Sequence, residues 1–162
     1  MQAANSNAST TPTAETADFV TVFVGQTMFG LAIDRVHDVF VPSGVTPVPL
    51  APPEIVGLLN LRGRVVTALC LRRRLGLPGR EPGAKEMAIG LEQGGETFAL
   101  VVDGVGEVLK LGPETHEPVP INLDMRWRGL STGVHRLDGR LLVILDVDAL
   151  LAFEAAPRAG AA

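Results

Sequence analysis

Residues 29–39 read FGLAIDRVHDV, and residues 98–108 read FALVVDGVGEV. The two stretches share a phenylalanine, a leucine, an aspartate and two valines at a constant offset of 69 residues. A second pair follows, with GLLNLRGRVVTAL at residues 57–69 and GVHRLDGRLLVIL at residues 133–145, at an offset of 76. Self-similarity at a nearly fixed spacing indicates that one structural plan occurs twice in the chain.

Short apolar runs separated by glycine and proline fill both halves. The chain holds 18 glycines and 12 prolines in 162 residues, which is typical of strands and turns rather than long helices. Strands are expected at residues 18–24, 27–34, 36–41, 58–69, 86–92, 97–103, 105–111 and 130–146, and short helices at 71–75 and 149–153. The sequence therefore predicts an all-β fold with short helices.

Hairpin turns are expected at Arg62-Gly63, Gly94-Gly95 and Asp138-Gly139. Glycine adopts a positive φ without strain, and tight hairpins require that conformation. Gly63 and Gly139 are therefore predicted to be structural turn residues, and Gly63→Val is predicted to destabilise its turn.

Polar segments of low complexity set the domain boundaries. A disordered tail is expected at residues 1–17 and a flexible tail at 154–162, because these segments bury too little apolar surface to offset the entropy of ordering. Between them, 18–153 forms one domain, in which the linker PGREPGAK at 78–85 separates subdomains at 18–77 and 86–153. Units this small are marginal alone, so the halves should pack together and leave a groove.

The larger second offset places an insertion in the second half of the chain. It falls within residues 112–128, which carry the only tryptophan, Trp127.

Composition argues against several classes of partner and cofactor. The net charge is −4, whereas binding to nucleic acid or to an anionic membrane depends on lysine and arginine neutralising phosphates. A barrel that binds nucleic acid is a rival interpretation, but one Trp and no Tyr provide few stacking surfaces. One cysteine, Cys70, and three scattered histidines favour no disulfide, no metal and no cofactor. No signal peptide or membrane-spanning run is present, so a cytoplasmic location is expected.

An enzyme is the other rival interpretation. Asp34 and Asp103 occupy equivalent positions in the two halves and would be the catalytic carboxylate pair of such an enzyme. Neither lies on the Asp-Thr/Ser-Gly loop of aspartic proteases. Strand-end or turn aspartates are therefore the preferred interpretation, and no catalytic residue is expected.

Two features favour binding of other proteins. Arg62 stands at a predicted hairpin tip beside apolar neighbours, where a guanidinium can make several directed hydrogen bonds. The equivalent valines Val36, Val39, Val105 and Val108 would form an apolar contact strip if strand alternation leaves them exposed.

The chain resembles the CheW family of chemotaxis coupling proteins. The resemblance covers about Phe19 to Leu151 and rests on Val48-Pro49, PPEIVG at 52–57, NLRG at 60–63, VVDGV at 101–105 and the segment from Gly139 onward. It implies two five-stranded SH3-like β-barrel subdomains related by internal duplication.

The resemblance also implies a function. Members of this family are non-enzymatic scaffolds that bind the cytoplasmic tip of methyl-accepting chemoreceptors and the CheW-like regulatory domain of CheA-type histidine kinases in membrane-associated arrays. It implies receptor-binding roles for Val36, Val39, Arg62, Met87, Val105 and Val108, and adaptor-coupling roles for Asp38, Gly57 and Gly133.

The chain departs from the family pattern in the strand after NLRG. Members often have Pro and Asp where this chain has Thr67 and Cys70, although Asp146 is kept in the second half. An alternative within the family is therefore a CheW-like scaffold for another output, such as surface motility or gene regulation.

Overall fold

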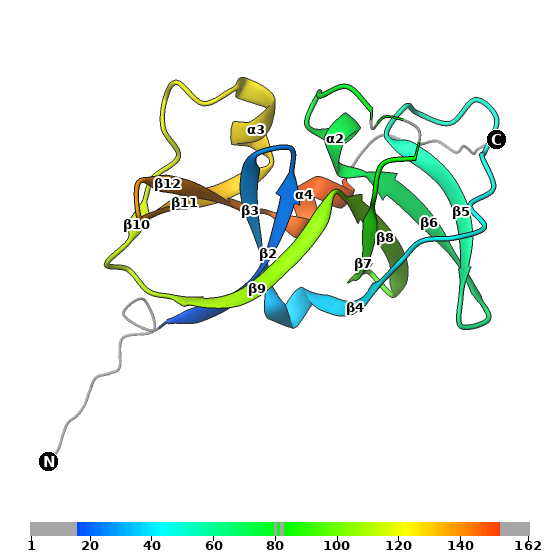
Figure 1. The fold of residues 1–162 in the computed structure, drawn as a ribbon, viewed down its shortest axis with the longest axis horizontal. Coiled ribbons are helices and arrows are strands. Elements are labelled where there is room, and N and C mark those ends of the chain that lie inside the picture. Colours follow the sequence, from blue (N-terminus) through cyan, green and yellow to red (C-terminus); the bar gives the residue numbers. More distant parts are fainter. Residues whose placement is uncertain (1–15, 80, 82, 153–162) are drawn as a thin grey trace, which may run out of the picture.

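A computed structural model describes residues 16–79, 81 and 83–152 (Figure 1). Its strands are β2 (Ala17–Val24), β3 (Thr27–Ala32), β4 (Val36–Phe40), β5 (Ile55–Leu61), β6 (Arg64–Cys70), β7 (Met87–Gln93), β8 (Glu96–Val102), β9 (Gly104–Leu111), β10 (His116–Glu117), β11 (Ser131–Leu137) and β12 (Arg140–Leu145). The helical turns are η2 (Ile33–Arg35), α2 (Leu71–Arg74), α3 (Met125–Gly129) and α4 (Val147–Leu151). The predicted all-β class with short helices is confirmed.

The boundaries differ from the expected ones in detail. Ala17, the last residue of the tail expected at 1–17, already belongs to β2. The tail expected at 154–162 lies outside the described residues. Helix α4 begins two residues earlier than predicted because the Asp146 side chain caps it by accepting a hydrogen bond from the Ala149 amide at 3.2 Å.

Two sheets lie side by side in the molecule (Figure 1). The first has six strands in the order β10-β11-β12-β3-β2-β9, and the second has five in the order β5-β6-β8-β7-β4. Without the short strand β10, the two orders correspond strand by strand under the sequence repeat. The structure therefore confirms the duplication, and β10 adds a sixth strand to one of the two expected five-stranded units.

Each sheet contains a hairpin from the other half of the sequence. Strands β2 and β3 join β9, β11 and β12, whereas β7 and β8 join β4, β5 and β6. Neither sheet is therefore built from residues 18–77 alone or from 86–153 alone, the ranges expected for the two subdomains. The apolar pattern of a strand defines which face is buried but does not define which sheet the strand joins.

The exchanged hairpins pair with the same register in both sheets. Phe29 of β3 pairs in parallel with Val143 of β12, and Phe98 of β8 pairs in parallel with Thr67 of β6. Both pairs contain equivalent residues, since 29 and 98 differ by 69 and 67 and 143 differ by 76. Residues that are equivalent in the sequence repeat therefore occupy equivalent positions in the two parallel strand pairs.

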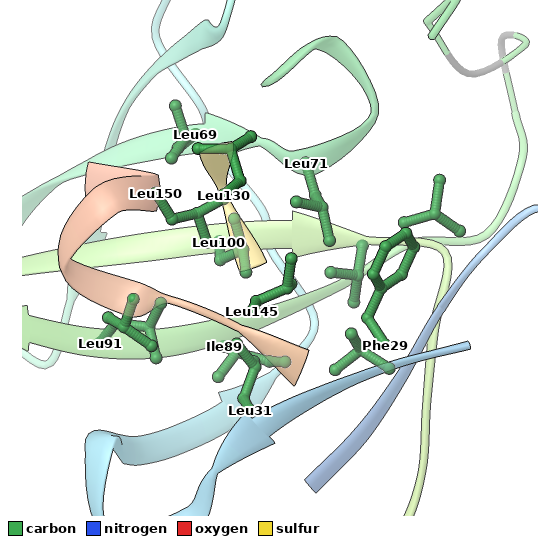
Figure 2. Close-up of a cluster of buried hydrophobic side chains, with 14 of the residues drawn as sticks. Phe29, Leu31, Leu69, Leu71, Ile89, Leu91, Leu100, Leu130, Leu145 and Leu150 are labelled. Carbon is green, nitrogen blue, oxygen red and sulfur yellow. The ribbon is translucent and has the colours of Figure 1, made fainter. Parts of the chain in front are cut away.

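The largest apolar cluster lies between the two sheets (Figure 2). It joins residues of the first sheet, such as Leu31 and Leu145, to residues of the second, such as Ile89 and Leu100. Two smaller apolar clusters are each confined to one sheet. The cluster around Leu142 belongs to the six-stranded sheet, and the cluster around Val66 belongs to the five-stranded sheet. Burial of apolar surface contributes roughly 25 cal/mol per Å², so the central cluster stabilises the two sheets as one unit. Among the described residues, no helix is long and apolar enough to cross a membrane.

The hairpin between β5 and β6 has the predicted turn. Arg62 and Gly63 have φ values of 54° and 84°, which is the pattern of a two-residue type I′ turn. The Gly63 amide donates a hydrogen bond of 2.9 Å to Asn60 Oδ1. Asp138 and Gly139 repeat the arrangement, with φ values of 46° and 78°.

Replacing Gly63 by valine is expected to destabilise the fold by about 2 kcal/mol, because a β-branched residue is strained at positive φ. No atom lies within 4 Å of a Cβ placed there, so the loss is one of backbone conformation and not of packing. Chemical denaturation measures it. Gly129→Ala, at an open position without positive φ, is the matched control and should leave the unfolding midpoint nearly unchanged.

Candidate functional site

The valines expected to bind a partner lie on two sheet edges. Strand β4 is an edge of the five-stranded sheet, and β9 is an edge of the six-stranded sheet. Both follow the lower side of the molecule in Figure 1, with η2 between them. Unpaired edges with exposed apolar side chains are ready surfaces for protein contact.

The four valines divide into two pairs. Val39 and Val108, which are equivalent in the repeat, have 45% and 50% of their surface exposed. Val36 and Val105 are half-buried and pack against the central cluster. The outer pair is therefore available to a partner, while the inner pair also supports the fold.

Met87 begins β7 and pairs with Val102 of β8. Its side chain is half-buried and packs against the central cluster. The structure therefore gives Met87 a packing role, in addition to any contact with a partner.

A bidentate ion pair joins the two edges of the five-stranded sheet. Arg62 Nη1 and Nη2 donate hydrogen bonds of 2.8 and 2.9 Å to the two carboxylate oxygens of Asp38. Asp38 lies on the edge strand β4, and Arg62 follows the opposite edge strand β5. The Asp38 side chain is 21% exposed and that of Arg62 is 74% exposed, so the guanidinium keeps most of its surface open to a partner.

Glycine at position 90 makes room for Asp38. Gly90 of β7 pairs with Asp38, and a Cβ at position 90 would lie 3.2 Å from the Cβ of Asp38. Gly90 was not predicted from the sequence as part of the site. Its signal was a glycine inside an apolar strand, MAIGL at 87–91, which marks close approach of another segment.

The second sheet lacks an equivalent of this ion pair. Under the repeat, Asp38 corresponds to Glu107 and Arg62 corresponds to Asp138. Two acidic residues cannot form an ion pair with each other, yet the six-stranded sheet folds. The Asp38–Arg62 pair is therefore dispensable for a sheet of this type, which favours a functional role for it.

Arg62 is also held in an unfavourable backbone conformation. Its φ of 54° costs a non-glycine residue about 1–2 kcal/mol. A side chain kept at such a position supports a functional hypothesis for the residue.

Gly57 and Gly133 mark equivalent irregularities in the two sheets. The register shifts between Ile55 and Gly57 in one sheet, and between Ser131 and Gly133 in the other. Both glycines are buried. A Cβ at Gly57 would collide with the backbone of Thr46, whereas a Cβ at Gly133 would meet His116 Nε2 at 2.7 Å. Neither residue offers a side chain to a partner, so any effect on coupling is indirect.

The two aspartates of the enzymatic interpretation have different environments. Asp103 accepts hydrogen bonds from Arg72 Nε and Nη2 at 3.0 and 2.7 Å and from the Gly25 amide at 2.6 Å. The Asp103 hydrogen bond raises the pKa of Arg72. Asp34 lies exposed in η2. Asp103 is therefore a structural tie between the end of β8, α2 and the β2–β3 turn, with its carboxylate held by Arg72 and the Gly25 amide.

A shallow cavity of about 280 Å³ lies beside Gly133 and contains two histidines. His135 is buried, and its Nδ1 lies 2.8 Å from Thr115 Oγ1. The His116 ring centre lies 5.3 Å from that of His135. Burial, aided by the nearby His116, lowers the pKa of His135 below its ordinary 6.5.

Stability is expected to decrease as the pH falls below about 6.5, because only the unfolded chain then binds a proton readily at His135. The slope for one proton is at most about 1.4 kcal/mol per pH unit, and it ends once the pH passes below the depressed pKa of the folded state. Urea unfolding between pH 5 and 8 measures this dependence. His135→Gln should flatten the dependence, and an unchanged slope in this variant would contradict the role of His135.

Comparison with known proteins assigns the chain to a family. The protein-family model of the CheW-like domain matches residues 18–155 of this chain. The chain belongs to the CheW-like family. Chemotaxis protein CheW of Klebsiella aerogenes is 30% identical over 137 residues, covering 85% of this chain and 82% of that protein. Chemotaxis protein CheW of Rhizobium meliloti is 28% identical over 131 residues, covering 81% and 84%.

A solved CheW structure has the same fold. Scaffolding protein TtCheW from Thermoanaerobacter tengcongensis superposes with a TM-score of 0.75 at 26% identity, covering 86% of this chain and 95% of that one. The resemblance noted from the sequence is thereby confirmed, together with the pair of SH3-like β-subdomains that it implied. Within this CheW-like domain, the residues expected to contact receptor and kinase remain predictions.

Proposed function

We propose that this CheW-like protein is a non-enzymatic adaptor that couples methyl-accepting chemoreceptors to a CheA-type histidine kinase at membrane-associated arrays. The observation that carries the proposal is the Asp38–Arg62 ion pair on the edge strand β4, which also exposes Val39, while Val108 is exposed on the edge strand β9. Family membership supports the same conclusion, since the relatives named above are chemotaxis proteins.

The receptor contact is the lower surface formed by β4, η2 and β9. A receptor tip is a helical hairpin, and an amphipathic helix binds by placing apolar side chains against an apolar surface. Val39 and Val108 supply that surface. Arg62, fixed in direction by Asp38, supplies directed hydrogen bonds at its edge.

The kinase contact uses other sheet edges of the same protein. CheA regulatory domains are CheW-like, so adaptor and kinase present similar edges to one another. Coupling between receptor state and kinase state requires a free energy of about 1–3 kcal/mol. Multivalent contacts in an array maintain the assembly even when each is weak.

Reconstitution tests the proposal. A receptor cytoplasmic fragment and a CheA-type kinase are mixed with and without this protein, and kinase autophosphorylation is measured. Autophosphorylation is expected to rise only when all three components are present. An unchanged autophosphorylation rate, together with no measurable binding of this protein to the receptor fragment or to the kinase, would contradict the proposed function.

Arg62→Gly separates the functional role of Arg62 from a structural one. The change removes the ion pair but also relieves the positive-φ strain of Arg62, so the melting temperature should stay equal or rise. Receptor binding should nevertheless weaken by about tenfold, the effect of losing one charged hydrogen-bonding group. A lower melting temperature with unchanged binding would show instead that Arg62 is structural.

A further inference from the structure

The upper side of the molecule carries a cluster of arginines that the proposed function does not use. We define the α2–α3 face as Arg73, Met125, Arg126 and Arg128, together with Ile121 from the preceding turn. Helices α2 and α3 lie along the upper side in Figure 1, opposite η2, β4 and β9. Most of this face belongs to the segment 112–128, within which the second half of the chain is longer than the first.

The insertion is fixed to the rest of the protein. Trp127 Nε1 donates a hydrogen bond of 2.9 Å to the Leu75 carbonyl just after α2, and its ring centre lies 5.4 Å from that of Phe29. Ser131 Oγ donates to the Trp127 carbonyl at 2.7 Å, and the Asp124 side chain caps α3. The inserted residues therefore form a defined surface beside α2.

Two glycines allow the arginines to lie close to the backbone. Arg126 Nη1 lies 2.8 Å from where a Cβ of Gly76 would be, and Arg73 Nη2 lies 2.6 Å from where a Cβ of Gly79 would be. The two guanidinium groups thus lie over consecutive parts of the segment that leaves α2. Burial lowers the pKa of Arg74, and the charge of Arg126 lowers it further, while the nearby Glu54 carboxylate acts in the opposite direction.

The charge of this face is not balanced within the described part of the chain. Arg72 is paired with Asp103, and Arg74 donates to the carbonyls of Leu150 and Ala149. Arg73, Arg126 and Arg128 are exposed, and none of them forms an ion pair with a carboxylate in the part of the chain that the structure describes. A protein of net charge −4 therefore presents one basic surface.

Exposed apolar side chains accompany the arginines. Met125 and Ile121 are 81% and 86% exposed, although both belong to a segment that is well anchored. Methionine adapts to varied apolar partners. A surface that combines guanidinium groups with such side chains fits an extended segment carrying both carboxylates and apolar residues.

We infer that the α2–α3 face binds an acidic, partly apolar linear segment of a partner protein. Arginine binds carboxylates in bidentate geometry. A flexible segment can lie along the basic face alone. An anionic membrane or a nucleic acid would also bring its charge against the remaining acidic surface and would be repelled there.

Peptide binding tests the inference on the full-length protein. The probes are two labelled twelve-residue peptides, one alternating glutamate with leucine and one with glutamine in place of each glutamate. Fluorescence anisotropy gives their affinities. The acidic peptide should bind in the range of about 10–100 μM and weaken as salt rises. Trp127, the single tryptophan, should report the same transition through its emission.

Charge reversal locates the binding surface. Arg126→Glu with Arg128→Glu should weaken binding about tenfold or more, and Met125→Ser should weaken it less. Arg64→Glu with Arg140→Glu changes the net charge equally at two exposed positions, the first residues of β6 and β12, and should have little effect. If circular dichroism shows that the double glutamate variant does not fold, Arg126→Gln with Arg128→Gln is used in its place.

Several outcomes would overturn the inference. They are equal binding of the glutamine peptide, equal loss in the Arg64 and Arg140 control, or tighter binding to phosphatidylglycerol vesicles than to the peptide. Reconstituted kinase activation should be unaffected by the Arg126 and Arg128 variants. Failure here is therefore distinguishable from failure of the proposed adaptor function.

Discussion

Replacing Gly57 by alanine is expected to lower the free energy of unfolding by about 3 kcal/mol, near the upper end of ordinary single substitutions. Gly57 has a φ of 154°, and its new Cβ would overlap the Thr46 carbonyl and approach Pro47 Cα to 3.0 Å. These atoms belong to the backbone, which cannot rotate away as a side chain can. The Thr46–Leu58 bridge, with hydrogen bonds of 2.7 and 2.8 Å, would have to open.

Gly133→Ala is the matched control for Gly57→Ala, because the two glycines are equivalent in the repeat. At Gly133 the Cβ would meet the end of the His116 side chain, which is exposed and can adopt another rotamer. The expected loss is below about 1 kcal/mol, and His116→Ala in the same chain should recover it. Urea denaturation measures all four proteins, and equal losses at both glycines would contradict the steric explanation.

Introducing glutamate at Val39 and Val108 together is expected to weaken binding of a receptor cytoplasmic fragment by about a hundredfold. Each change places a charge in an apolar contact, and a loss of about 1.4 kcal/mol at each residue, within the range of interface substitutions, gives this factor. Both valines are about half exposed on edge strands, so folding should be little affected. Isothermal titration against the fragment gives the affinities, and thermal denaturation verifies folding.

Val65→Glu is the control for this double variant. Val65 is an exposed valine on β6, which is not an edge strand, and its replacement should leave the affinity for the receptor fragment within about twofold. A large loss of affinity in Val65→Glu, or none in the double variant, would place the receptor contact elsewhere on the protein.

Local patterns were sufficient to predict most elements of this fold. Turns such as Arg62-Gly63 and Asp138-Gly139 were predicted because positive φ has a clear signature in residue type. The sheet membership of the hairpins was not predicted correctly. Phe29 buries its side chain in the central cluster whichever sheet β3 joins, so its pattern is the same for both topologies.

The candidate site was predicted as separate residues but not as an arrangement. Asp38 and Arg62 were both named from the sequence, but their ion pair depends on the two edges of one sheet approaching each other. Val36 and Val39 were both predicted to bind the receptor, because the sequence pattern does not show which of the two is buried. A register shift between Val36 and Asp38 leaves Val36 against the central cluster and Val39 exposed.

The reciprocal placement of the β2–β3 and β7–β8 hairpins has the form of a swapped dimer joined into one polypeptide. In a swapped dimer, two identical chains exchange the same element, and here the two copies are successive parts of one chain. Neither half can then be excised as an autonomous fragment. Cleavage between α2 and β7 should yield two pieces that complement each other non-covalently, and a perturbation of one sheet is transmitted to the other through strands that they exchange.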